Sequence, residues 1–84
     1  MSCQLLHRID PDRNMARFYR VEVMPDLFGA VVVERRWGRI GGRGQCRLAS
    51  YLSTTLAEAA ASDLVRSKER RGYRVAASSQ PVPG

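Results

Sequence analysis

The chain has 84 residues, enough for one domain in which a single sheet and a single helix share the core. A chain this short buries only about 60 to 65% of its unfolded surface, which leaves little room for a deep catalytic cleft and argues against an enzyme. Fourteen basic side chains, thirteen of them arginine, oppose eight acidic ones and give a net charge of +6. Because the arginine fork fits phosphate and stacks on rings, this balance favours an anionic partner, although a basic surface that only keeps the protein soluble stays an alternative.

The first half of the chain predicts three antiparallel strands. Gln4 to Asp10 forms a first strand with Leu6 and Ile9 directed inward. A polar connection with a proline leads to the clearest strand, Met15 to Met24, in which apolar and polar residues alternate at period two. A turn with proline and glycine then reverses the chain, and Ala30 to Trp37 returns as a strand rich in β-branched residues.

The returning strand does not show which of its sides faces the core. One side carries Val31, Val33, Arg35 and Trp37, and the other carries Val32, Glu34 and Arg36. Glycines at positions 38, 41, 42 and 44 then predict a tight turn before a further strand, Gln45 to Tyr51. Together these segments predict an antiparallel meander.

A helix is predicted after this strand. Thr55 and Glu58 fit a capping box at its start. Its apolar stripe is expected to consist of Leu56, Ala60 and Leu64, with Ala59 or Val65 to one side. Gly72 supplies a left-handed stop, and Tyr73 to Ala76 predicts a last short strand. The remaining stretch is polar and contains two prolines, so we expect a domain over residues 1–77 and a disordered tail over residues 78–84.

The segment from Arg35 to Ala57 contains the only tryptophan and five arginines, but no Asp or Glu. A flat aromatic surface beside guanidinium groups suits a partner that is stackable and anionic, such as an exposed nucleic-acid end. Two simpler interpretations stay open: Trp37 could cover the end of the core, with Arg39 folded over its ring, and the arginines could form a solvated strand face. Arg43 and Arg47 lie near the glycine turn, and we favour them as contacts with the anionic partner over Arg35 and Arg36.

Other chemistry has little support in the sequence. Cys3 and Cys46 have no metal-binding spacing and predict no disulfide, and His7 is the only histidine, so neither a metal site nor nucleophilic catalysis is expected. Tyr19 and Tyr73 are expected at the edge of the core, with their hydroxyls in solvent. The amino terminus resembles no signal peptide and the longest apolar run is too short to span a bilayer, so we expect a cytoplasmic protein without membrane contact.

Four features occur together in an order that resembles the WGR domain. They are Phe18-Tyr19-Arg20-Val21 on a strand, Arg36-Trp37-Gly38-Arg39-Ile40-Gly41 at a strand end, Gly44-Gln45 opening the next strand, and a capped helix that ends in Arg71-Gly72-Tyr73. This domain is found in DNA-dependent poly(ADP-ribose) polymerases and in bacterial proteins, sometimes alone. The resemblance covers residues 4 to 73 and implies an α+β fold, a curved antiparallel sheet of about four to five strands packed against one helix.

The resemblance also implies a function. In the polymerases the domain binds DNA near a break, the motif tryptophan packs against the sugar at a strand end, and the motif arginine relays that contact to a catalytic domain. This sequence contains no catalytic domain and no zinc fingers, so we expect a stand-alone bacterial member in which only the binding role of Arg39 is kept. The expected site holds DNA ends or breaks with low sequence specificity and no cofactor, and consists of Trp37, Gly38, Arg39, Arg43, Arg47 and Arg36.

A second interpretation stays open beside DNA binding. The basic face could dock an acidic partner protein, including a separately encoded enzyme, because a small domain without chemistry of its own often works for another protein. The oligomeric state is also open, since a long strand at an open sheet edge could pair across a two-fold axis.

Overall fold

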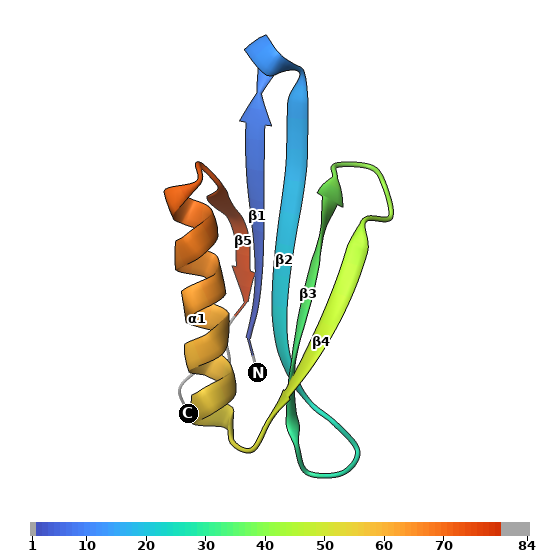
Figure 1. Ribbon diagram of the computed structural model, residues 1–84, viewed down its shortest axis with the longest axis vertical. Coiled ribbons are helices and arrows are strands. Elements are labelled where there is room, and N and C mark those ends of the chain that lie inside the picture. Colours follow the sequence, from blue (N-terminus) through green and yellow to red (C-terminus); the bar gives the residue numbers. More distant parts are fainter. Residues whose placement is uncertain (1, 80–84) are drawn as a thin grey trace.

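The computed structural model describes residues 2–79, which form a five-stranded antiparallel sheet and one helix packed against it (Figure 1). The elements are β1 (Cys3–Asp10), a 3-10 turn (Pro11–Arg13), β2 (Met15–Pro25), β3 (Val31–Arg39), β4 (Gln45–Tyr51), α1 (Thr54–Arg70) and β5 (Arg74–Ser79). The strands lie in the order β4-β3-β2-β1-β5, and every neighbouring pair is antiparallel. The predicted α+β fold is confirmed.

One face of the sheet packs on α1 and forms the core. Its buried side chains come from alternating strand positions and from one side of the helix: Leu6, Tyr19, Val21, Val23, Val31, Val33, Ala57, Ala61 and Val65. The burial of Val31 and Val33 decides the question that the sequence left open, because side chains two positions apart on a strand share a face. Arg35 and Trp37 therefore also face the helix side. Ile9 lies three positions from Leu6 and is 63% exposed, so the expectation that it points inward is wrong.

The N-cap of the helix lies two residues before Thr55, the start of the predicted capping box. Ser53 is the N-cap, and its hydroxyl accepts a hydrogen bond from the backbone N–H of Leu56 at 3.2 Å. Glu58 instead accepts hydrogen bonds from the Ser2 hydroxyl at 3.0 and 2.8 Å, which ties the residue before β1 to the helix. The centre of the buried side lies one residue later than the predicted stripe: Leu56 is 53% exposed and Ala57 is fully buried, whereas Leu64 is partly buried against the core, as expected, beside the buried Val65.

The glycines after Trp37 allow two backbones to touch. A methyl group on Gly38 would lie 2.6 Å from the Cα of Gly44, and one on Gly44 would collide with the carbonyl oxygen of Trp37 and approach the Phe18 ring. Gly44 also has φ +72°, a left-handed conformation that other residues rarely adopt. The spacing of glycines around the tryptophan therefore serves the close turn from β3 to β4, as the sequence predicted.

The last strand returns to the opposite edge of the sheet. β5 pairs with β1 and extends to Ser79, beyond the predicted end at Ala76. Residues 78 and 79 of the predicted tail thus pair with β1, and residues 80–84 lie outside the described residues. Gly72 has φ +96° directly after the helix, so the predicted left-handed stop is confirmed. The end of α1 lies at the same end of the molecule as the β3–β4 turn (Figure 1).

Candidate nucleic-acid interface

Two surface grooves meet at Trp37 and Lys68, which line both of them. The first groove has a volume of about 560 Å³ and is lined by Arg13, Asn14, Met15, Ala16, Arg17, Trp37, Gly38, Arg39, Lys68 and Tyr73. The second, of about 260 Å³, is lined by Tyr19, Arg35, Trp37, Arg47 and Lys68. We call these two grooves together the cationic groove, because six of their lining residues are arginine or lysine.

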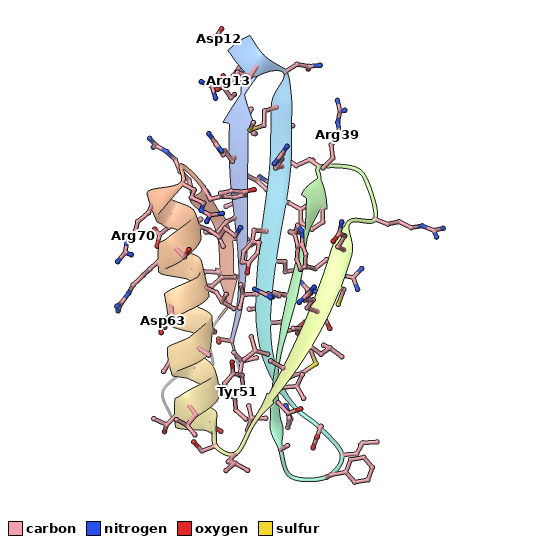
Figure 2. All side chains as sticks on the ribbon, in the orientation of Figure 1. Asp12, Arg13, Arg39, Tyr51, Asp63 and Arg70 are labelled. Carbon is pink, nitrogen blue, oxygen red and sulfur yellow. The ribbon has the colours of Figure 1, made fainter. Side chains whose placement is uncertain are left out.

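Strand register and the end of the helix assemble the cationic groove. Antiparallel pairing of β2 with β3 sets Arg17 opposite Arg39 and Tyr19 opposite Trp37. The connection from β1 to β2 adds Arg13, which lies at the same end of the molecule as Arg39 (Figure 2). Residues from the start, the middle and the end of the chain therefore converge around one indole ring.

Trp37 is partly buried and is held by neighbours on the helix side of the sheet. Its ring lies 6.5 Å from that of Tyr19, centroid to centroid, with the two planes at 34°. The guanidinium carbon of Arg35 lies 5.6 Å from the indole centroid, a cation–π arrangement. Arg35 thus takes the place over the ring that the sequence suggested for Arg39. Because both contacts restrain the indole, it is already oriented before any ligand binds.

Lys68 carries an ammonium group among aromatic rings and other cations. Its Nζ lies 4.8 Å from the centroid of Tyr19 and 5.7 Å from that of Tyr73. Burial lowers the pKa of Lys68 below its ordinary value, and the positive charges of Arg71 and Arg35 lower it further. Because these surroundings disfavour the charged form of Lys68, an anion that enters the cationic groove would stabilise it.

Tyr19 is 2% exposed, and its hydroxyl is buried without a hydrogen-bond partner among the described residues. The expectation that this hydroxyl reaches solvent is therefore wrong. Burial raises the pKa of the Tyr19 phenol, and the adjacent guanidinium of Arg35 opposes this shift. The phenol consequently stays neutral at physiological pH and adds no negative charge to the cationic groove.

Carboxylates are kept out of the groove lining. Neither of its parts is lined by an Asp or Glu side chain within residues 2–79. Asp10 is the carboxylate paired with a lining residue, and its oxygen lies 3.7 Å from the Nε of Arg13, a residue that is mostly exposed. The groove therefore presents positive charge that is available to an anionic partner.

Comparison with known proteins identifies the family. A model of the WGR domain matches residues 2–80 of this chain. The chain belongs to the WGR domain family. The uncharacterized protein y4dW of Sinorhizobium fredii is 44% identical over 69 residues, which make up 82% of this chain and 34% of that protein. The chain thus spans about a third of the length of this relative.

The WGR motif lies at the centre of the cationic groove. Trp37, Gly38 and Arg39 line its first part, and Arg47 lines the second. Arg43 is exposed in the β3–β4 turn and lines neither part. Arg36 points to the opposite face of the sheet, where its guanidinium lies 3.6 Å from a carboxylate oxygen of Glu34. Contact of these residues with DNA stays a prediction, and it has geometric support for those that line the groove.

Sequence reasoning did not assign the other walls of the groove. Arg13, Arg17, Lys68 and Tyr73 lie far from the motif along the chain, and Arg35 was ranked below Arg43. The position of Arg17 could have indicated one of these walls. Arg17 lies two residues before Tyr19 on the same strand, and antiparallel pairing places it opposite the motif arginine Arg39.

Residues 2–79 contain no group of three or more His, Cys, Asp or Glu side chains that could hold a metal ion. Over the same range, no helix has the length and apolar character needed to cross a membrane.

Proposed function

We propose that this WGR domain is a non-catalytic module that holds DNA ends or breaks through stacking on Trp37 and contacts between arginines and phosphates. The WGR family is a family of nucleic-acid-binding modules and is not itself catalytic. The observation that carries the proposal is the cationic groove, in which six cations surround a restrained tryptophan and no carboxylate of the described residues lines the wall.

The charges of the groove suit a phosphate backbone. Arg17 and Arg39 face each other across β2 and β3, and Lys68 approaches from the helix. These cations repel one another when the groove is empty, and phosphate oxygens relieve that repulsion while accepting bidentate hydrogen bonds from arginine. Contacts with about four to six phosphates predict a slope of about −4 to −5 in a plot of log affinity against log salt concentration.

The indole accounts for a preference for ends. Inside a continuous duplex each base is stacked on both sides, so an aromatic side chain finds no free ring or sugar face there. At an end or break one such face is exposed, and the held ring of Trp37 can pack against it at little entropic cost. Phosphate contacts give general affinity in this scheme, and Trp37 selects the end.

A titration of four DNA forms tests the proposal. Blunt linear, nicked, single-stranded and closed circular DNA of matched sequence are each titrated at two salt concentrations. We expect tighter binding to the linear and nicked duplexes than to the closed circle, and a steep loss of affinity with salt for all four. Equal affinity for linear and closed duplexes would refute end binding, and an affinity that changes little with salt would refute the phosphate contacts.

The alternative of an acidic partner protein uses the same charges but gives Trp37 no specific role. Recovery of one stoichiometric protein from a pull-down after nuclease treatment, together with equal affinity for all DNA forms, would favour it.

A further inference from the structure

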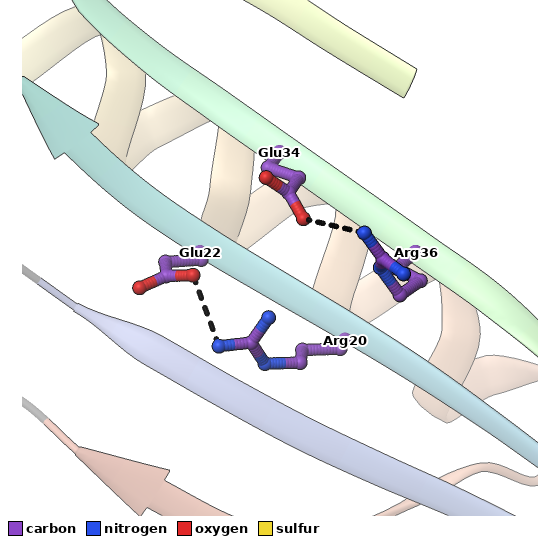
Figure 3. Close-up of polar contacts among 4 residues, drawn as sticks. All are labelled: Arg20, Glu22, Glu34 and Arg36. Atoms are coloured by element: carbon purple, nitrogen blue, oxygen red, sulfur yellow. Dashed lines mark hydrogen bonds and ion pairs between the residues drawn. The ribbon is translucent and has the colours of Figure 1, made fainter. Parts of the chain in front are cut away.

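The sheet has a second face, turned away from α1, which we call the open face. At its centre lie Arg20 and Glu22 of β2 and Glu34 and Arg36 of β3, whereas the residues between them along each strand point toward the helix. Figure 3 shows these four side chains in front of the two strands, with the helix behind the sheet. Among the described residues, α1 is the one α-helix, and it lies on the other face.

The charges on the open face follow an unusual order. Ion pairs form along each strand: Arg20 lies 3.0 Å from Glu22, and Arg36 lies 3.6 Å from Glu34 (Figure 3). Across the strands, however, Arg20 stands opposite Arg36 and Glu22 stands opposite Glu34. Like charges that face each other directly across two strands destabilise a sheet. The Nε of Arg36 is also buried without a hydrogen-bond partner among the described residues. A basic row and an acidic row therefore lie side by side, with like charges directly opposite each other, and Glu34 stabilises the charge of Arg20 only along the diagonal.

Apolar side chains extend this pattern on both sides. Beyond the acidic row lie Met24 and Val32, which are paired in register, and beyond the basic row lies Phe18. On β4, Leu48 is paired with the acidic row and is 66% exposed, while Cys46 is paired with the basic row. Along the strands, the side chains of the open face are thus apolar, basic, acidic and apolar, in that order.

This order is complementary to itself, and we propose that two copies of this chain pair through their open faces. The two-fold axis lies in the interface and crosses the strands at the level of the paired residues Val21 and Arg35. Rotation about it exchanges the two charged rows, so Arg36 meets Glu34 of the second copy, and Arg20 meets its Glu22. It also brings the apolar ends together, and such an isologous contact closes into a dimer.

The geometry of the dimer is that of two sheets packed face to face, which lie about 10 Å apart. The second copy relieves the like-charge pairs of the first and offers acceptors to the buried Nε of Arg36. Its charges fix register and partner choice more than affinity, and the apolar rows supply the buried area. The cationic groove lies on the helix side of the sheet, so dimerisation leaves it free.

A charge-exchange experiment tests this dimer. Sedimentation equilibrium of the nucleic-acid-free protein measures association of the original chain, of Glu34→Arg, of Arg36→Glu, and of an equimolar mixture of the two variants. Each reversal alone sets like charges against each other twice in the dimer, so dimerisation should weaken more than about tenfold. In the mixture the arginine of one variant meets the glutamate of the other, and heterodimers should form. The double variant Glu34→Arg/Arg36→Glu in one chain should dimerise again.

Controls separate association from folding. Glu69→Arg makes the same charge change on the exposed surface of α1 and should leave dimerisation unchanged. Thermal melting establishes that each variant is folded, and where a reversal unfolds the chain, the uncharged variants Glu34→Gln and Arg36→Gln take its place and should also weaken the dimer. The proposal is overturned if the original chain is monomeric throughout the micromolar range, if the single reversals leave dimerisation intact, or if the mixture fails to restore it.

Discussion

Replacing Trp37 with alanine separates the two roles that its position allows, support of the core and contact with a nucleic-acid end. The side chain is partly buried and packs on Tyr19. Truncation of a fully buried tryptophan costs about 3 to 5 kcal/mol, so a partly buried one should cost about 2 to 3 kcal/mol. Small domains have about 5 to 15 kcal/mol of stability, and Trp37→Ala should therefore remain folded with a lowered melting temperature.

The binding effect of Trp37→Ala should depend on the form of the DNA. Loss of stacking on one nucleotide costs about 1 to 3 kcal/mol, which corresponds to a loss of about 5-fold to 150-fold in affinity for linear duplex. A closed circle offers no end, so its affinity should change little. Competition titrations of linear and closed circular DNA of the same sequence measure both values, and their ratio is independent of the fraction of active protein.

Val23→Ala is the matched control for stability. Val23 is a fully buried core residue on the part of β2 that lies away from the cationic groove. Its truncation should also lower the melting temperature but leave the ratio of the two affinities unchanged. A folded Trp37→Ala protein that keeps the original preference for ends would refute the stacking role and leave the tryptophan as part of the core.

Three further variants probe the groove. If Arg47 contacts a phosphate as proposed, Arg47→Ala should weaken linear and closed DNA alike and reduce the magnitude of the salt slope by about one. Gly44→Ala should cost about 1 to 3 kcal/mol of stability for its left-handed backbone and more for the collision with the carbonyl of Trp37, measured by denaturant unfolding. Lys68→Met removes a charge that is costly in the fold, so it should melt no lower than the original chain while binding DNA more weakly.

Each of these variants has its own check. Arg70→Ala removes a charge that points away from the molecule on α1, and it should leave the salt slope unchanged (Figure 2). Gly42→Ala has no left-handed backbone and meets one carbonyl oxygen at 3.3 Å, so a loss of stability equal to that of Gly44→Ala would contradict the close-turn argument. For Lys68, the lowered pKa means that the unfolded chain binds the proton more tightly. The stability of the original chain should therefore rise relative to Lys68→Met as pH increases from the lowered pKa toward 10.5.

The sheet was predictable from the sequence because its strands alternate clearly. Gln45–Tyr51 has the predicted bounds, and β1, β2 and β3 differ from prediction by one or two residues at their ends. The core side of β3 was not predictable, because the face that contains Val31 and the face that contains Val32 have similar polarity in the sequence. Only packing of α1 on Val31 and Val33 distinguishes them, and that choice also decides that Arg35 faces the groove and Arg36 the open face.

The helix differs from prediction in its cap and in the centre of its buried side. Thr55 and Glu58 satisfy the capping-box pattern, but Ser53 caps the helix, and the Glu58 carboxylate accepts hydrogen bonds from Ser2, far away in the sequence. Adjacent helix positions lie about 100° apart, so a buried side centred one residue later than predicted contains Ala57 and leaves Leu56 exposed. Local patterns could not reveal either feature, because the bond that engages Glu58 and the packing of α1 on the sheet are long-range contacts.

The motif predicted the centre of the candidate site but not its extent. Trp37 and Arg39 were assigned from the sequence, whereas Arg17 reaches the groove through strand register and Lys68 through the length and direction of α1. Net charge could not locate these walls either, because Glu69 follows Lys68 directly in the sequence, yet no carboxylate lines the groove within the described residues. Separation of acids from bases is thus a property of the fold, created when strand pairing and helix packing direct neighbouring side chains to different surfaces. The Trp-Gly-Arg motif should accordingly bind DNA only in a chain that also supplies cations equivalent to Arg17 and Lys68.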